Sequence, residues 1–157
     1  MHDEYNVFML QAIEMAKKAY QLGEIPVGAL IVRNGEIISQ AYNSRETDKN
    51  ALAHAEIKAI DEACKKLGGW RLIGCDLYVT LEPCPMCTGA IINSRIERVI
   101  YGADNPKFGS CGSVVNLTDF PYNHKPEIIA GVMADECSYL LKLFGKSLRS
   151  RNEDLSK

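Results

Sequence analysis

Two short segments contain residue types that together bind a metal ion and move protons. They are His54-Ala55-Glu56 and Pro83-Cys84-Pro85-Met86-Cys87. A catalytic zinc site uses three protein ligands and leaves a fourth position for water. One imidazole and two thiolates define three corners of a tetrahedron, and no fourth ligand is obvious nearby in the sequence. The pattern therefore predicts an open zinc site with His54, Cys84 and Cys87 as its ligands.

Glu56 follows His54 by two residues and need not bind the metal. Beside an activated water, a carboxylate takes the water's proton and returns it to a leaving group. Pro85 suits the first turn of a helix, so Cys84 and Cys87 lie three residues apart at a helix start and point to one side. The positive charge of that helix end favours thiolates, the form that binds metal. We therefore predict a hydrolytic enzyme with Glu56 as its catalytic residue.

Each half of this pattern is ambiguous when it stands alone. A lone Cys-x-x-Cys also occurs in redox sites and in half zinc sites, and a lone His at a helix start is usually structural. The combination of His-x-Glu with Pro-Cys-x-x-Cys is much more specific. It is the signature of zinc nucleobase deaminases, for which the tRNA-acting deaminases are a standard example. A zinc-bearing binding module without catalysis is the alternative from another class, and Glu56 argues against it because a structural site needs no proton shuttle.

The elements that position these segments follow from the hydrophobic pattern. Helices are predicted over residues 3–22, 53–67, 85–93 and about 134–150, and strands over 27–33, 36–42, 76–81, 97–101 and 127–132. Asn34-Gly35 is a strong hairpin signal between the first two strands. Residues 43–50 and 105–125 are predicted to be mostly loop. The alternation of strands and helices favours an α/β fold: a three-layer α/β/α sandwich whose mixed five-stranded sheet has helices on both faces. The order of the strands does not follow from the pattern.

Composition sets limits on the class of protein. The 157 residues are 46% apolar and 24% charged, which is ordinary for one globular domain, and we expect that domain to span residues 1–157 with a tail over 151–157. The net charge of −2 argues weakly against nucleic acid as a partner. The polar, acidic start does not resemble a signal peptide, and no apolar run is long enough for a membrane span. We therefore expect a cytoplasmic protein without a membrane partner, whose six cysteines are thiols or metal ligands.

The chain resembles the bacterial tRNA adenosine deaminases from about residue 5 to residue 149. Beyond His54-Ala-Glu56, the resemblance rests on Glu24-Ile-Pro-Val-Gly-Ala29, Leu77-Tyr-Val-Thr-Leu-Glu-Pro-Cys-Pro-Met-Cys87, Gly89-Ala-Ile-Ile-Asn-Ser-Arg-Ile96, Tyr101-Gly-Ala103, Asn123-His124 and Gly131-Val-Met-Ala-Asp-Glu-Cys137. It implies the cytidine-deaminase-like fold, a homodimer, and one zinc ion per subunit held by the three ligands predicted above. The implied reaction converts the wobble adenosine (position 34) of a tRNA anticodon into inosine. Hydroxide attacks C6 of the flipped base, and ammonia leaves.

The resemblance also implies roles for residues outside the metal-binding motif. Asn43 would form a hydrogen bond with the purine. Pro26 and Val27 would line the base pocket, although Val27 also suits a core strand. The backbone of Glu82 would lie near the amino group of the base.

Contacts with the tRNA are expected on two segments. Asn105 lies in a loop that faces RNA in the family, where an Asp is common, and Lys107 follows it. Lys142, Lys146 and Arg149 form one stripe of the last helix, and phosphate contacts need such a stripe. A solvated helix face is the other interpretation of this stripe. The alternative function is a small-molecule nucleobase or nucleoside deaminase of the guanine or cytidine type with the same metal site, and the long basic helix argues against it.

Overall fold

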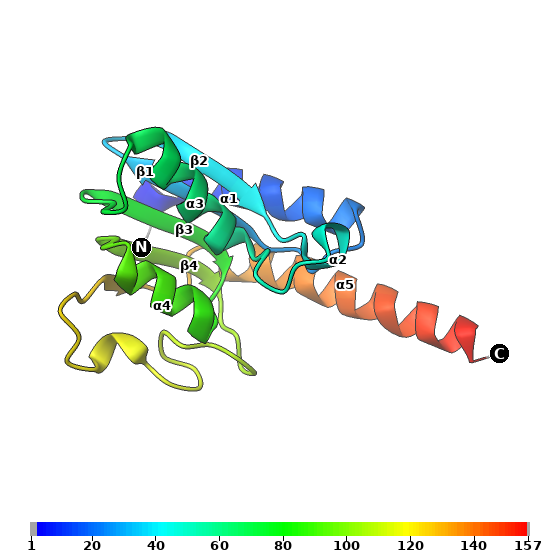
Figure 1. Ribbon diagram of the computed structural model, residues 1–157. Coiled ribbons are helices and arrows are strands. Elements are labelled where there is room, and N and C mark those ends of the chain that lie inside the picture. Colours follow the sequence, from blue (N-terminus) through cyan, green and yellow to red (C-terminus); the bar gives the residue numbers. More distant parts are fainter. Residues whose placement is uncertain (1–2, 157) are drawn as a thin grey trace.

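The computed structural model describes residues 3–156, and its centre is a mixed five-stranded sheet (Figure 1). The strands are β1 (Gly28–Arg33), β2 (Glu36–Tyr42), β3 (Cys75–Leu81), β4 (Arg98–Ala103) and β5 (Glu127–Ile129). Their order in the sheet is β2-β1-β3-β4-β5. Strand β1 is antiparallel to both of its neighbours, whereas β3, β4 and β5 run parallel. The predicted fold class is confirmed, and the tertiary structure supplies the strand order.

Helices cover both faces of the sheet, as Figure 1 shows. Helix α1 (Asp3–Gln21) and helix α5 (Ala134–Leu155) pack together on one face. Helix α3 (Ala55–Leu67) and helix α4 (Pro85–Asn93) pack together on the other. Two short helices, α2 (Arg45–Asp48) and η1 (Leu117–Asp119), lie in connecting segments. The zinc motif thus belongs to the α3–α4 layer.

The alternation of side chains along the strands builds a core on each face of the sheet. Ile31 and Leu77 are buried against α3 and α4. Leu30 and Tyr78, one residue away along the same strands, belong to the core beneath α1 and α5. Successive residues of a strand point to opposite faces, so a strand buried on both sides is apolar throughout. The central strands form a rigid platform from which the loops at their ends extend.

Local signals determine where several elements begin and end. Asn34 and Gly35 have φ values of 52° and 77°, as the tight turn between β1 and β2 requires. Gly68, with a φ of 73°, ends α3 in the left-handed conformation. Pro85 is the first residue of α4. These sequence predictions are confirmed.

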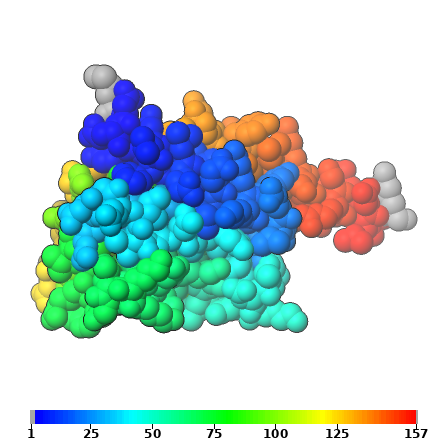
Figure 2. Space-filling model, turned by 90° about the horizontal axis from the view of Figure 1, so that it is seen from above, coloured from blue at the N-terminus to red at the C-terminus, as the bar shows by residue number. Residues whose placement is uncertain are grey.

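The main differences from the sequence prediction are an added helix and the ends of the last two elements. The expected loop over residues 43–50 contains α2. The last strand ends at Ile129 instead of residue 132, and α5 continues to Leu155, so most of the expected tail is helical. Residues 150–155 contain neither Gly nor Pro, so nothing in them stops the helix. Figure 2 shows the last turns of α5, in red, extending beyond the body of the molecule.

Candidate zinc-dependent active site

The two halves of the metal motif meet because two helices of the same layer begin close together. His54 is the residue before α3, and Cys84 is the residue before α4. Both have extended backbone conformations, as residues that precede a helix usually do. Cys87 lies in the first turn of α4, where it is buried. The side chains from the two helix starts therefore converge on one point.

The distances between these side chains fit a tetrahedral zinc ion. The Nδ1 atom of His54 is 3.6 Å from the Sγ atom of Cys84 and 3.5 Å from the Sγ atom of Cys87. With bonds of about 2.3 Å to sulfur and about 2.0 Å to nitrogen, tetrahedral zinc separates these atoms by about 3.5 Å. All three donor atoms lie within 4.8 Å of one another. The donor set and its geometry thus match a zinc site with three protein ligands.

Hydrogen bonds within the triad shift the pKa values of its three side chains. Hydrogen bonds from Cys87 and His54 lower the pKa of the Cys84 thiol to about 4, although burial opposes the shift. The hydrogen bond with Cys84 raises the pKa of His54, and the same neighbour together with burial raises the pKa of Cys87. Cys87 and His54 thus contribute the protons of the hydrogen bonds that stabilise the negative charge on Cys84. Zinc ligands must be deprotonated, so a bound dication displaces those protons.

Glu56 lies on the first turn of α3, directly beside this triad. Its side chain is buried, with 4% of its surface exposed, and it lines the same cavity as His54 and Cys84. Burial raises the pKa of the Glu56 carboxyl to about 7, and the thiolate of Cys84 adds to the rise. The backbone N–H of Glu56 and the thiol of Cys87 donate hydrogen bonds to the carboxyl group. A carboxyl group with this pKa both accepts and returns protons near neutral pH.

A cavity of about 480 Å³ opens beside the metal triad and Glu56. This volume lies within the range of small-molecule sites. The apolar part of its wall includes Ile25, Val27, Leu81, Met86 and Phe108. Its polar wall includes Asn43, Arg45 and Asn105. The cavity therefore offers apolar surface for a flat ring and a few polar groups to orient that ring.

The structure places the predicted base-binding residues as follows. Asn43 and Val27 line the cavity, and both are buried. The Nδ2 atom of Asn43 donates to the carbonyl of Ile25 over 3.4 Å, which restrains the amide. Pro26 is buried next to Val27, but it is Ile25 on its other side that lines the cavity. Of the three residues that precede β1, Ile25 and Val27 thus line the cavity, whereas the predicted Pro26 does not.

Glu82 has a role that its sequence position does not suggest. Its buried carboxylate does not line the cavity but accepts hydrogen bonds from the backbone N–H groups of Asn105, Cys111 and Ser113, at 3.1, 3.1 and 3.0 Å, and from the Ser113 hydroxyl. These bonds fold residues 105–113 around one anion. The folded loop carries Asn105 and Phe108 to the cavity wall.

The remaining predicted RNA contacts lie outside the cavity. Lys107 is exposed on the loop that Glu82 folds. Lys142, Lys146 and Arg149 are exposed on α5, around a shallow groove of that helix. No described residue of α5 lines the cavity. The structure therefore separates a site for chemistry from the basic stripe on α5, a helix that projects from the body of the molecule (Figure 2).

Sequence reasoning missed several residues of the cavity wall. Met86 lies between the two cysteine ligands, so its position was available from the motif. Arg45, Ala51 and Phe108 lie in segments without hydrophobic periodicity, where nothing in the sequence marks a residue as facing a cavity. Ile25 reaches the wall only because the chain turns into β1 beside it.

Comparison with known proteins agrees with this site. Residues 2–103 match the family model for the cytidine and deoxycytidylate deaminase zinc-binding region. The chain is 51% identical over 148 residues to the tRNA-specific adenosine deaminase of Bacillus subtilis (strain 168), covering 94% of this chain and 92% of the relative. This protein belongs to the zinc-dependent cytidine and deoxycytidylate deaminase family, in its tRNA-specific adenosine deaminase branch.

Two solved structures show the fold of this deaminase. One comes from work on A-to-I editing by tRNA:A34 deaminases at the wobble position of transfer RNA. It has a TM-score of 0.83 and 41% identity, and the match covers 85% of this chain and 98% of that one. The other is the guanine deaminase from Bacillus subtilis, with a TM-score of 0.62 and 36% identity over 80% of this chain and 81% of that one. The second likeness shows that the same scaffold also serves a small-molecule deaminase.

Proposed function

We propose that this protein converts adenosine to inosine at the wobble position of a tRNA anticodon, by zinc-dependent hydrolytic deamination. The observation that carries the proposal is the convergence of His54, Cys84 and Cys87 beside the buried Glu56, in a cavity large enough for a nucleobase. The 51% identity to a tRNA-specific adenosine deaminase over nearly the whole chain supports the choice of substrate.

The chemistry divides between the metal and the protein. When bound to the triad, zinc lowers the pKa of a water molecule to about 7, which makes hydroxide available at neutral pH. Glu56 would accept the two protons of that water in turn and would deliver one to the ring nitrogen and one to the departing amino group. In sum, water and adenosine give inosine and ammonia. The burial of Glu56 suits this role, because a carboxyl group with a pKa near 7 releases its proton as readily as it takes one.

The cavity wall holds the base. Val27 and Phe108 provide apolar surface for the purine ring. Asn43 supplies an amide with both a donor and an acceptor, and its hydrogen bond to Ile25 limits how far that amide can rotate. A flipped base held in this way is recognised by its edge and its faces.

We further propose that tRNA binds across the cavity mouth and along the exposed stripe of α5. Asn105 and Lys107 lie near the cavity, whereas Lys142, Lys146 and Arg149 lie on the projecting helix. This spread of polar and basic groups exceeds what a single nucleoside needs and suits a folded stem-loop. Single-stranded RNA loops are read mainly through splayed bases in pockets, so a net charge of −2 is compatible with the proposal.

The assembly and the compartment are also proposals. The resemblance to the family implies a homodimer, which light scattering would measure as twice the chain mass of 17.4 kDa. No helix within residues 3–156 is long and apolar enough to cross a membrane. We propose the cytoplasm as the place of action because tRNA is found there.

A small-molecule deaminase is the second candidate, and the likeness to a guanine deaminase favours it. One experiment separates the two functions. The zinc-loaded protein is incubated with an anticodon stem-loop carrying adenosine at position 34 and, in parallel, with free adenosine, guanine and cytidine. Inosine in the RNA with little change in the free compounds supports tRNA deamination. Deamination of a free base or nucleoside alone overturns the tRNA proposal and keeps the zinc site.

A further inference from the structure

The segment between β2 and α3 brings a cation to the edge of the cavity. Arg45 begins α2, and its side chain lines the cavity together with Asn43 and Ala51. Among the described residues that line this cavity, Arg45 is the sole Arg or Lys. Since Arg45 is also exposed, its guanidinium group belongs to the mouth of the cavity.

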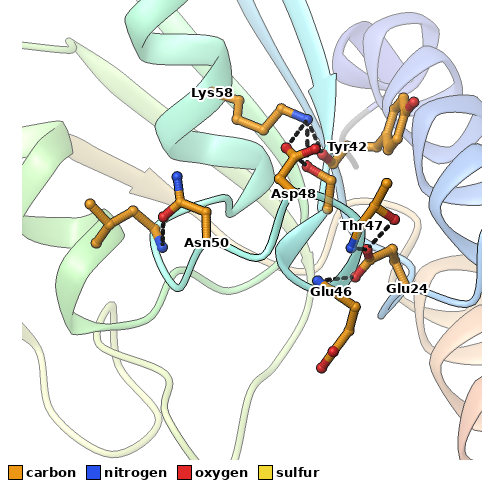
Figure 3. A network of polar contacts seen from close by, with 9 residues as sticks. Glu24, Tyr42, Glu46, Thr47, Asp48, Asn50 and Lys58 are labelled. Carbon is orange, nitrogen blue, oxygen red and sulfur yellow. Dashed lines mark hydrogen bonds and ion pairs between the residues drawn. The ribbon is translucent and has the colours of Figure 1, made fainter.

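The positive charge of Arg45 has no ion-pair partner among the described residues. Neither acidic residue of α2 forms an ion pair with Arg45. The Asp48 carboxylate accepts a hydrogen bond from the Ser44 hydroxyl at 2.7 Å and lies 3.8 Å from the Nζ atom of Lys58. In Figure 3 the side chain of Glu46 points away from this network. The charge of Arg45 is thus available to a ligand.

The backbone around Arg45 is held in place by a buried carboxylate from a distant part of the chain. Glu24 is 2% exposed and accepts hydrogen bonds from the N–H groups of Glu46 and Thr47, at 3.2 and 2.6 Å, and from the Thr47 hydroxyl at 2.6 Å (Figure 3). The N–H groups of a helix's first turn lack partners within the helix. In α2, the Glu24 carboxylate accepts hydrogen bonds from two of these groups. On the other side, the N–H of Asn50 donates to the Arg45 carbonyl at 3.0 Å.

Glu24 supports Arg45 without forming an ion pair with it. Burial raises the pKa of the Glu24 carboxyl, but the hydrogen bonds from Thr47 and Glu46 and the charge of Arg45 together hold it below its ordinary value. Glu24 is therefore ionised at neutral pH. Both of its oxygens already accept hydrogen bonds from the backbone and hydroxyl of α2. No described carboxylate forms an ion pair with Arg45, so an anion that pairs with it would come from a ligand.

The geometry of the substrate identifies that anion. A nucleobase inside the cavity leaves its ribose and the adjoining phosphates at the mouth, where Arg45 lies. The planar guanidinium fork matches phosphate oxygens and binds them in pairs. We propose that Arg45 binds a phosphate of the RNA backbone next to the target adenosine, and that Glu24 is the positioning residue that holds Arg45 there. This inference rests on the proposed function.

The first test compares Arg45→Gln with Lys49→Gln in deamination of the anticodon stem-loop. Lys49 is a matched control, because it is an exposed cation of the same segment that does not line the cavity. We expect Arg45→Gln to raise KM about tenfold, with kcat within about twofold, and Arg45→Lys to recover part of the loss. Lys49→Gln should change neither constant. The slope of log affinity against log salt should fall by about 0.7 in Arg45→Gln alone, as for one lost phosphate contact.

The second test changes the RNA. A series of stem-loops carries one neutral methylphosphonate at each of the phosphates flanking position 34. In the wild-type protein, one of these replacements should raise KM about as much as Arg45→Gln does. The same replacement should have no further effect in Arg45→Gln, because the two changes remove one interaction. If every replacement weakens both proteins equally, Arg45 contacts no phosphate.

The third test addresses the positioning role of Glu24. Glu24→Gln should raise KM by a smaller factor than Arg45→Gln while leaving the zinc content unchanged. In the Arg45→Gln background it should raise KM no further. A Glu24→Gln effect of equal size in both backgrounds would show that Glu24 acts without Arg45 and would overturn the positioning role.

These outcomes distinguish a failure of the Arg45 assignment from a failure of the proposed function. If the wild-type protein leaves the stem-loop unchanged, the proposed function and the assignment of Arg45 fail together. If the wild-type protein forms inosine and Arg45→Gln keeps its KM and its salt slope, the assignment of Arg45 alone fails. Zinc content and thermal unfolding, measured for each variant, show that the comparison is made between folded proteins.

Discussion

The Nδ1 atom of His54 lies 3.5 Å from the Sγ atom of Cys87, although 33 residues separate them in the sequence. The separation equals the edge that tetrahedral zinc spans between nitrogen and sulfur. The starts of α3 and α4 bring the two atoms together, and the core beneath these helices holds the starts in place. The metal site is thus a product of how two helices pack on one face of the sheet.

Removing a buried ligand should remove the metal. We expect Cys87→Ala to reduce the zinc content from about one ion per chain to nearly none, because only two ligands would remain. It should also lower the melting temperature, since the binding energy of a structural or catalytic metal contributes to the stability of the fold. Elemental analysis and thermal unfolding measure both effects. Cys64→Ala, a change at a half-buried free cysteine outside the triad, should keep the metal. Full zinc content in Cys87→Ala would contradict the assignment.

Replacing Glu56, the proposed proton carrier, should separate metal binding from turnover. Glu56→Gln keeps the shape of the buried side chain but has no carboxylate to accept a proton. We expect kcat to fall by about 10²- to 10⁴-fold, the usual contribution of general acid–base catalysis. Zinc content should stay at the wild-type value. Single-turnover assays of inosine formation, with zinc measured on the same samples, provide the comparison. Wild-type turnover in this variant would exclude Glu56 from the mechanism.

The Glu82 carboxylate should contribute stability that is lost in acid. Burial raises its pKa, but the hydrogen bonds from Ser113, Asn105 and Cys111 outweigh burial and lower the net pKa below the ordinary 4.5. A group whose pKa is lower in the folded state stabilises the fold fully above its unfolded value and loses that effect as pH falls through its folded value. The difference in unfolding free energy between wild type and Glu82→Gln should therefore be constant above pH 4.5 and shrink below it.

The size of the Glu82 effect follows from its partners. At neutral pH we expect Glu82→Gln to cost about 1–3 kcal/mol of unfolding free energy, the range for hydrogen bonds to a buried charged group. Denaturant titrations over a pH series measure it. Glu127→Gln, at an exposed strand position, serves as the control. A difference that grows as the pH falls below 4.5 would show that the sign of the pKa shift is wrong.

The loop that Glu82 folds has no room for a side chain at Gly109. A Cβ atom there would lie 2.5 Å from the carboxylate of Glu82 and 2.5 Å from the carbonyl oxygen of Asn105. We expect Gly109→Ala to destabilise the protein by about 1–3 kcal/mol, because the loop must move. Since the loop carries Phe108, KM for the RNA should rise as well.

A glycine with free space around it provides the matched control. Gly89 lies within α4, and a Cβ atom added there meets no atom within 4 Å. Gly89→Ala should stabilise the helix by about 0.5–1 kcal/mol, because alanine has the higher helix propensity. Equal unfolding free energies for the two variants would mean that the loop accommodates a Cβ atom at residue 109 without a loss of stability.

Several hydrogen bonds of the site join residues far apart in the sequence, which explains what sequence reasoning missed. Glu24 bonds to a helix that begins 21 residues later, and Glu82 bonds to a loop about 23 to 31 residues later. Such bonds leave no periodic trace in the sequence. The segment over residues 43–50 is by itself typical of a polar loop. It forms α2 with the buried carboxylate of Glu24 bonded to its first N–H groups.

The amino-acid sequence by itself determined the chemistry of this deaminase. The types and spacing of His54, Glu56, Cys84 and Cys87 predict a zinc site with a proton carrier, and the hydrophobic periodicity predicts the helices and strands that position them. Only the tertiary structure decided the strand order, the cavity wall and the position of Arg45 at its mouth. These depend on how loops fold around buried carboxylates. That folding depends on hydrogen bonds between distant residues and on the packing of the sheet. Local sequence patterns predict neither of them.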